Sequence, residues 1–283
     1  MQILDGVKVS NLILDEVKGE VEKLKVEGIN PKVVVILVGE NPASVSYVNQ
    51  KKKAAEKTGI DFELYQVNDI SQEDLVKKIN ELNEDDSVHG ILVQLPLPEK
   101  INVPLVMKEV CPRKDVDGFT AYNLGKMFLS KEFEDLVPCT PKGVFRLLDY
   151  YNIDVKGKDV VVVGHSNIVG KPLSTMFLNR DATVTTCHIH TKDLKAHTSR
   201  ADIVAVAVGK PGLITEDMVK EGAILIDIGF SKVDGKIVGD LDFENVKEKA
   251  SYISPVPGGS GPMTVACLME NIVSAAKRLS KKT

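Results

Sequence analysis

Residues 160–170 read VVVVGHSNIVG, and this stretch decides the fold. Four consecutive valines are typical of a strand covered on both faces, as in a parallel sheet. Gly164 ends the expected strand, and Gly170 with Pro172 marks the start of a helix. The loop between them can point backbone N–H groups and the positive end of the helix at a phosphate. The stretch therefore favours an α/β domain that binds a nucleotide.

The spacing of this loop departs from the usual dinucleotide fingerprint. It follows G-x-S-x-x-x-G rather than G-x-G-x-x-G, because Ser166 replaces the middle glycine and Gly170 comes one residue late. The acidic residue that bonds a ribose 2′-hydroxyl is expected about 20 residues further on. Residues 188–190 read His-Ile-His instead, which favours NADP. An ordinary strand–turn–helix connection is the alternative for the loop taken alone.

Strand and helix patterns alternate in two stretches of the chain. In the first stretch we expect strands at residues 33–38, 62–67 and 88–95, and helices at 42–58 and 71–83. In the second we expect helices at 141–151, 170–179 and 263–279, and strands at 159–163, 182–186, 202–208, 223–228 and 252–254. Such alternation indicates βαβ units and parallel sheets. The pattern predicts two α/β domains with a boundary near residues 118–122.

The composition of the 283-residue chain is that of an ordinary globular protein, with 43% apolar and 27% charged residues. This length favours two domains over a single hydrophobic core. A net charge of −4 and the absence of Trp argue against a nucleic-acid partner. The longest apolar run, residues 33–38, is too short for a membrane span, and the first residues do not resemble a signal peptide.

The four cysteines are scattered, with no two at C-x-x-C spacing. They therefore indicate neither a zinc knuckle nor a redox pair. Single cysteines in a chain of this length fit a reducing compartment, so we expect a cytoplasmic protein without a metal site.

The expected helix after residue 41 carries a candidate acid–base pair. Tyr47 and Lys51 are four residues apart and point to the same side, with Ser44 one turn earlier, whereas Lys52 and Lys53 are rotated away. An amine beside a phenol can accept and return protons. The alternative is a core tyrosine next to lysines that coat a solvated face.

Three further segments combine polar residues with rigid turns. Residues 90–98, GILVQLPLP, place Gln94 at the carboxyl end of an expected strand, where α/β sheets bind ligands. Residues 114–118, KDVDG, suit a solvated turn or a carboxylate that accepts two hydrogen bonds from a ligand ring, but not an EF-hand. Residues 255–262, PVPGGSGP, let backbone approach a flat ligand closely, or serve as a linker.

Taken together, these segments resemble the bifunctional methylenetetrahydrofolate dehydrogenase/methenyltetrahydrofolate cyclohydrolase family. The matching pieces span almost the whole chain in the family's order, and their joint match is specific. They are YVxxKxKA at residues 47–54, GILVQLPLP at 90–98, KDVDGF at 114–119, PCTP at 138–141, SxIVGxP at 166–172, PVPGG at 255–259 and GPMT at 261–264.

The resemblance implies two α/β domains that flank a cleft, the second being a Rossmann-like nicotinamide-dinucleotide domain. Residues 1–119 would form the folate-binding catalytic domain, with the helix at 263–283 packing back on it, and residues 120–262 the dinucleotide domain. The implied ligands are tetrahydrofolate one-carbon derivatives and NADP, and the implied assembly is a homodimer. The implied reactions are oxidation of the methylene bridge and hydrolysis of the methenyl product to formyl-tetrahydrofolate.

The resemblance also implies roles for individual residues. Lys51 would be central to hydrolysis, with Gln94 bonded to it, while Tyr47 holds the folate and Asp117 accepts from the pterin; these four form the catalytic set. The substrate would be bound by Tyr47, Ser44, Asp117, Pro257, Gly258 and Gly259. The cofactor would be bound by Thr140, Gly164, His165, Ser166, Ile168, Gly170, Ile189 and His190.

The chain departs from the family pattern where relatives hold the NADP 2′-phosphate. His165 stands where Arg is usual, Ile189 stands where Ser is usual, and His190 occupies a position that is often basic. A neutral imidazole binds phosphate less well than a guanidinium group, so NAD competes with NADP as the expected cofactor. Ser260 stands where Val is common.

Three rival functions remain at this point. A dehydrogenase of the same fold with one activity predicts loss of the Lys51 or Gln94 type, but both residues are present. An amino-acid or shikimate-type dehydrogenase would not explain the segments around Gln94 and Pro257. A non-catalytic module that senses nucleotides predicts cofactor binding without turnover.

Overall fold

The computed structural model describes residues 1–281; the last two residues of the C-terminal segment expected to pack on the first domain lie outside this range. The chain forms two compact units. The three-stranded unit comprises Asn11–Lys126, Phe133–Cys139 and the residues from Val265 onward, and the six-stranded unit comprises Met1–Ser10, Met127–Glu132 and Thr140–Thr264.

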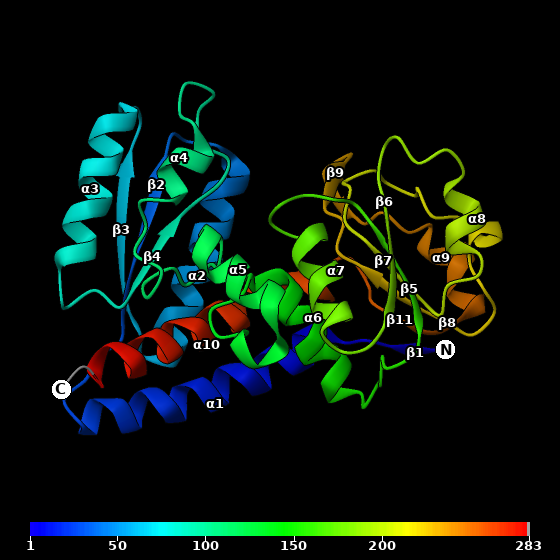
Figure 1. The fold of residues 1–283 in the computed structure, drawn as a ribbon, viewed down its shortest axis with the longest axis horizontal. Helices are drawn as coiled ribbons and strands as arrows, with labels where there is room; N and C mark the ends of the chain where they lie inside the picture. Colours follow the sequence, from blue (N-terminus) through cyan, green and yellow to red (C-terminus); the bar gives the residue numbers. More distant parts are fainter. Residues whose placement is uncertain (282–283) are drawn as a thin grey trace. The chain divides into compact units, whose positions relative to one another are not determined.

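The three-stranded unit is built on a parallel sheet in the order β3-β2-β4 (Figure 1). Its strands are β2 (Lys32–Val38), β3 (Asp61–Val67) and β4 (Gly90–Val93). Every residue of β2 after Lys32 is buried, as expected for a central strand with both faces covered. Strand β4 ends at Val93, so Gln94 lies just beyond the strand rather than inside the predicted range 88–95.

Capping residues define the two main helices of this unit, α2 (Pro42–Thr58) and α3 (Gln72–Glu84). Asn41 accepts hydrogen bonds from the first-turn N–H groups of α2, and Gly59 ends the helix with φ +77°. Ser71 caps α3 by accepting from Asp74 N at 3.0 Å. The predicted helix start at Asn41 and Pro42 and the stop at Gly59 are confirmed.

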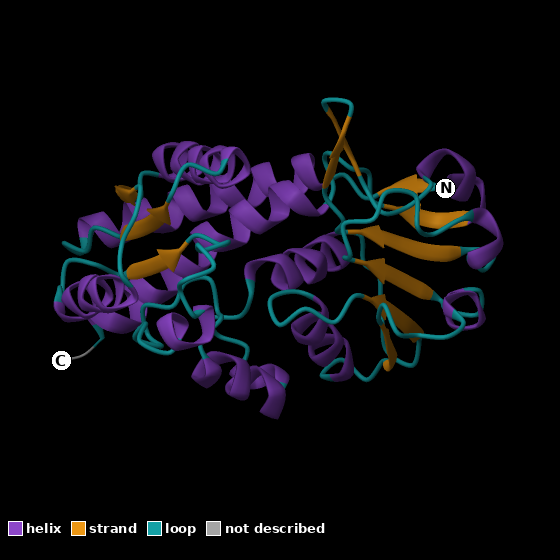
Figure 2. Cartoon of the chain, turned by 90° about the horizontal axis from the view of Figure 1, so that it is seen from above, coloured by secondary structure: helices purple, strands orange, loops and turns teal. Residues whose placement is uncertain are grey.

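The six-stranded unit contains a fully parallel sheet in the order β1-β11-β8-β7-β5-β6. Its strands are β1 (Gln2–Ile3), β5 (Asp159–Val163), β6 (Thr183–Cys187), β7 (Ile203–Val206), β8 (Ala223–Asp227) and β11 (Ala250–Ile253). A separate hairpin of β9 (Ser231–Val233) and β10 (Lys236–Val238) stands apart from this sheet (Figure 2). Parallel strands joined by helices give the α/β class that the sequence predicts.

The remaining elements are helical. They are α1 (Gly6–Val26), α4 (Val103–Met107), α5 (Ala121–Leu129), η1 (Lys131–Phe133), α6 (Cys139–Tyr150), α7 (Gly170–Leu178), α8 (Leu194–Thr198), η2 (Glu216–Met218), α9 (Phe243–Val246), η3 (Lys247–Lys249) and α10 (Ser260–Ser280). None of the helices within residues 1–281 is both long and apolar enough to cross a membrane.

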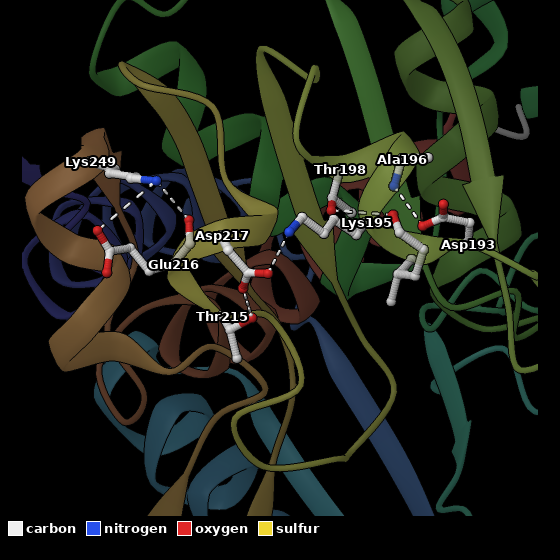
Figure 3. Close-up of polar contacts among 9 residues, drawn as sticks. Asp193, Lys195, Ala196, Thr198, Thr215, Glu216, Asp217 and Lys249 are labelled. Carbon is white, nitrogen blue, oxygen red and sulfur yellow. Dashed lines mark hydrogen bonds and ion pairs between the residues drawn. The ribbon is translucent and has the colours of Figure 1, made fainter.

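Polar contacts tie the short helices of the six-stranded unit together (Figure 3). Lys195 of α8 pairs with Asp217 of η2 at 2.7 Å, and Lys249 donates to the Glu216 carbonyl at 3.0 Å. The side chains of the Lys195–Asp217 pair are more than half exposed, so this ion pair adds little stability. The network therefore orders local surface structure.

Candidate active site

Lys51 and Gln94 form the centre of the candidate site in the three-stranded unit. The Lys51 side chain projects from α2, is only 7% exposed, and donates from Nζ to Gln94 Oε1 at 2.9 Å. The amide nitrogen of Gln94 donates to the Leu95 carbonyl at 2.7 Å, which fixes the orientation of the amide and aims its oxygen at the amine. Lysine is almost never buried to this extent unless it is paired, and buried titratable groups of this kind are typical of functional sites.

Two other residues of α2 lie on the same side of the helix. Ser44 is 2% exposed, and its hydroxyl donates to the Leu95 carbonyl at 3.5 Å. Tyr47 is half-buried, and burial raises the pKa of its phenol above the usual value. Lys52 and Lys53 are exposed, as the helical spacing predicts. The helix thus presents a hydroxyl, a phenol and an amine on one side, and the hydroxyl and the amine contact the chain that follows β4.

Asp117 carries the carboxylate of the site and keeps part of its surface accessible. Burial raises the pKa of its carboxyl, and the positive charge of Lys51 opposes this rise. Asp115 raises the pKa further, while a hydrogen bond from the Cys139 thiol lowers it. Lys51 and Asp117 are therefore electrostatically coupled within one unit. Cys139 was not among the predicted site residues, although its PCTP motif could have pointed to it.

The other charged residues of the KDVDG segment support the fold. Lys114 is 4% exposed, and its ammonium donates to three carbonyls at the end of α3, those of Leu82, Asn83 and Asp85, at 2.7–3.0 Å. Asp115 is 1% exposed and accepts from the backbone N–H groups of residues 118, 119 and 120 and from the Asn123 amide. Their fixed positions leave Asp117 as the carboxylate of this turn that can meet a ligand.

The loop between β5 and α7 has the geometry of a phosphate-binding turn. Gly164 has φ +121°, and a Cβ there would lie 2.5 Å from the Ala207 carbonyl oxygen. A Cβ on Gly170 would lie 2.0 Å from the Gly164 oxygen, so both glycines are sterically required. The Ser166 hydroxyl accepts from the N–H groups of Val169 and Gly170 at 3.1 and 3.3 Å. The exposed residues 165–168 lie at the start of α7, where the helix dipole favours an anion.

Three imidazole rings gather beside this loop. The rings of His165 and His188 are 4.9 Å apart and those of His188 and His190 are 5.9 Å apart. Ile189 between them is 88% exposed. The rings come from the segments after β5 and β6, so parallel pairing of these strands brings the two segments together. Protonated imidazoles at this position can bind a phosphate group. Among residues 1–281, no cluster of His, Cys, Asp or Glu is arranged to hold a metal ion.

Two buried carboxylates shape the carboxyl end of the same sheet. Asp240 is fully buried and accepts from the N–H groups of residues 208–210 at 2.6–3.0 Å. Asp227, the last residue of β8, accepts from the N–H groups of residues 229, 240 and 241. Both belong to the framework of the loops rather than to the predicted site, and an acidic residue at the end of a buried strand is the signal that could have identified Asp227.

The remaining predicted site residues lie in the six-stranded unit. Thr140 and Thr264 share a hydrogen bond of 3.0 Å between their hydroxyls. Gly258 has φ +109°, and its carbonyl accepts from Val7 N at 3.1 Å. The Gly259 carbonyl oxygen packs against the start of α1, where a Cβ on Gly6 would lie 1.8 Å from it. Pro257 follows a cis peptide bond. Ser260 donates from its hydroxyl to the Asp227 carbonyl at 2.9 Å, which explains how a serine is accommodated there.

The predicted residues therefore fall into two groups. Ser44, Tyr47, Lys51, Gln94 and Asp117 belong to the three-stranded unit. The other group belongs to the six-stranded unit and comprises Thr140, Gly164, His165, Ser166, Ile168, Gly170, Ile189, His190, Pro257, Gly258 and Gly259.

Comparisons with known proteins agree with this division into two groups. Residues 4–117 match the model of the tetrahydrofolate dehydrogenase/cyclohydrolase catalytic domain, and residues 138–280 match that of the family's NAD(P)-binding domain. The bifunctional protein FolD of Nautilia profundicola is 53% identical over 284 residues, covering 100% of this chain and 99% of that protein.

Solved structures of FolD enzymes are also similar to this chain. The crystal structure of the bifunctional FolD enzyme from Campylobacter jejuni superposes with a TM-score of 0.96 at 52% identity, covering 98% of this chain and 99% of that one. A Trypanosoma brucei FolD structure, complexed with NADP cofactor and inhibitor, has a TM-score of 0.94 at 36% identity, covering 99% and 98%. The chain is therefore a member of the tetrahydrofolate dehydrogenase/cyclohydrolase family.

Proposed function

We propose that this protein oxidises 5,10-methylenetetrahydrofolate to the 5,10-methenyl derivative with NADP⁺ and hydrolyses that product to 10-formyltetrahydrofolate. The observation that carries the proposal is the nearly buried Lys51 amine, which donates a hydrogen bond to Gln94 at 2.9 Å. These residues lie within the segment that matches the family's catalytic domain. In this proposal residues 1–119 with the C-terminal helix form the folate-binding catalytic domain, and residues 120–262 form the dinucleotide-binding domain.

The hydrolytic step needs proton transfers, which we assign to Lys51. The methenyl carbon is electrophilic because its positive charge is shared between two folate nitrogens. Water adds its oxygen to this carbon, one C–N bond breaks, and the electron pair returns to the nitrogen that leaves. The neutral amine of Lys51 takes one proton from the water and returns it to that nitrogen, the second proton of the water is released to solvent as the C=O of the formyl group forms, and the hydrogen bond to Gln94 orients the amine.

The other residues of the folate group bind and orient the substrate. Asp117 accepts hydrogen bonds from the donor edge of the pterin, a role that suits a carboxylate with part of its surface open. Tyr47 and Ser44 hold the ring from α2. Pro257, Gly258 and Gly259 contribute backbone without side-chain bulk to the folate. Orientation of this kind supplies most of what hydride transfer requires from a protein.

The geometry of the β5–α7 loop fits a nicotinamide dinucleotide, which supplies the hydride acceptor when bound. Gly164, Ser166, Ile168 and Gly170 would hold the phosphates with backbone N–H groups at the start of α7, with Thr140 nearby. We assign NADP as the preferred cofactor, because the rings of His165 and His190 would offer hydrogen-bond donors to the 2′-phosphate. NAD remains a second candidate, because Ile189 offers the 2′-phosphate no hydrogen-bond donor from its side chain.

We further propose that the enzyme is a cytoplasmic homodimer whose partners are folate derivatives rather than nucleic acids or membranes. The scattered free cysteines and the negative net charge support this placement. Sedimentation of the purified protein tests the dimer directly.

One assay separates the proposed function from its rivals. Purified protein is mixed with methylenetetrahydrofolate and NADP⁺ or NAD⁺, and absorbance follows the reduced nicotinamide and then the decay of methenyltetrahydrofolate. Two sequential signals support the bifunctional enzyme, whereas a first signal without the second supports a dehydrogenase with one activity. Cofactor binding without either signal would overturn the proposal in favour of a sensing module.

A further inference from the structure

Asn271 is a fully buried amide on α10 that bonds to two separate loops. Its side-chain nitrogen donates to the Val116 carbonyl at 2.9 Å and to the Val137 carbonyl at 3.0 Å. The same nitrogen lies 3.6 Å from the sulfur of Cys139. A buried amide needs hydrogen-bond partners, and Asn side chains can find them on backbone groups close in the sequence. This amide instead joins segments more than 130 residues away in the sequence.

The two loops that Asn271 joins are the ones that position Asp117. Val116 precedes Asp117, the Cys139 thiol donates to the Val116 carbonyl at 3.4 Å, and the same thiol lowers the pKa of the Asp117 carboxyl. The loops are also in direct backbone contact, because a Cβ on Gly118 would lie 2.4 Å from the Val137 carbonyl carbon. A small displacement of either loop would therefore move the Asp117 carboxylate.

Asp115 fixes the chain that directly follows Asp117. The Asp115 carboxylate fixes the N–H groups of residues 118–120 and is itself 1% exposed. The Val116 carbonyl accepts from the Cys139 thiol and has a second lone pair for a donor from α10. Asn271 supplies that donor and so helps to fix the backbone beside Asp117, whose carboxylate has to stay partly open to its ligand.

We propose that Asn271 is a positioning residue for Asp117: it holds the Val116 carbonyl and Cys139 so that the Asp117 carboxylate meets the folate donors and the charge of Lys51. This inference rests on the proposed function, because it takes Asp117 as the folate-binding carboxylate. Asn271 acts through Val116 and Cys139, so it affects folate binding and the pH dependence of hydrolysis rather than cofactor binding.

The test compares Asn271→Leu with Ile272→Ala. Leu has the same branching and number of side-chain heavy atoms as Asn but no donor, and Ile272 is equally buried on the same helix, so its truncation costs stability without removing a hydrogen bond. We expect Asn271→Leu to raise the folate KM about tenfold or more, since small misplacements near a site have effects of this size. Its pH profile for hydrolysis should also shift, whereas the dissociation constant of NADP should match that of the parent. Ile272→Ala should lower the melting temperature and leave the folate KM and the pH profile unchanged.

A folded Asn271→Leu protein with the parental folate KM and pH profile would overturn the inference. Should that variant not fold, Asn271→Gln carries the test, because it keeps both donors but moves them by one methylene group. A raised folate KM with an unchanged NADP dissociation constant then supports the positioning role, and parental values exclude it. A parental protein that neither binds nor converts folate would contradict the proposed function and this inference together. An active parent with an unaffected variant contradicts the inference alone.

Discussion

Replacing Lys51 with methionine should separate the two proposed activities. Methionine is similar in length to lysine and fills most of the nearly buried space, but it carries no proton. Loss of a general acid–base group typically slows a reaction by about 10²–10⁴-fold, or about 3–5 kcal/mol in activation free energy. Hydride transfer depends mainly on orientation, so we expect the dehydrogenase rate to stay within about tenfold of the parent.

The cost in stability should be much smaller than the cost in hydrolysis. The variant removes the 2.9 Å bond to Gln94, but Gln94 is partly exposed and water can replace the amine. We therefore expect a decrease of less than about 1 kcal/mol in the free energy of unfolding. The variant also removes the positive charge that lowers the pKa of Asp117, so that pKa should rise further. As the pH falls, the Asp117 carboxylate becomes protonated and folate binding weakens. In the variant this weakening should begin at a higher pH than in the parent.

The measurement follows methenyltetrahydrofolate decay and reduced nicotinamide formation in parallel, with thermal unfolding as a check of the fold. Lys52→Met is the matched control, because Lys52 is the next residue on α2 and its side chain is exposed. This control should retain both activities. A folded Lys51→Met enzyme that hydrolyses methenyltetrahydrofolate at the parental rate would refute the assignment of the lysine, and equal loss of both activities would refute its specific role in hydrolysis.

Three other outcomes are expected. Gly170→Ala places a Cβ 2.0 Å from the Gly164 oxygen, so it should raise the cofactor KM and lower the free energy of unfolding in denaturant titrations by about 1–3 kcal/mol. The control is Gly19→Ala, whose Cβ meets no atom within 4 Å and which should leave the free energy of unfolding unchanged or raise it. Burial raises the pKa of Asp227 to about 6 from 3.8, so between these pH values the native state keeps a proton that the unfolded state has released. The free energy of unfolding should therefore fall by about 3 kcal/mol as the pH rises from about 4 to about 6. In urea unfolding, Asp227→Asn should show a smaller fall over this pH range, and an equal fall would contradict this origin. His165→Leu should lower the ratio of kcat/KM for NADP to that for NAD about tenfold, because the ring of His165, which lies beside that of His188, offers the 2′-phosphate a hydrogen-bond donor that leucine lacks; an unchanged ratio would exclude His165 from the phosphate site.

Local sequence predicted much of the secondary structure. The cap at Asn41, the stop at Gly59 and the strand at residues 159–163 appear in the structure as expected, because each depends on residues within a few positions of one another. The long helix α1 and the short strand β1 were not anticipated. Helix α1 could have been found from Val9, Ile13, Val17 and Val21, whose spacing of four is helical and which are all buried. Strand β1 has only two residues and exists through its pairing with β11 in a parallel sheet.

The candidate site divides in the same way. Helical spacing alone placed Tyr47 and Lys51 on one side of α2, and strand–turn–helix order alone placed the glycines at residues 164 and 170. The tertiary structure decided which charged residue of the KDVDG segment stays open, because Lys114 is occupied by the carbonyls that end α3 and Asp115 by nearby N–H groups. It also decided that Asn271 supports Asp117. The physical reason is that helix and strand periodicity is set by neighbours in the sequence, whereas the partner of a buried polar group is set by packing between segments far apart in the chain.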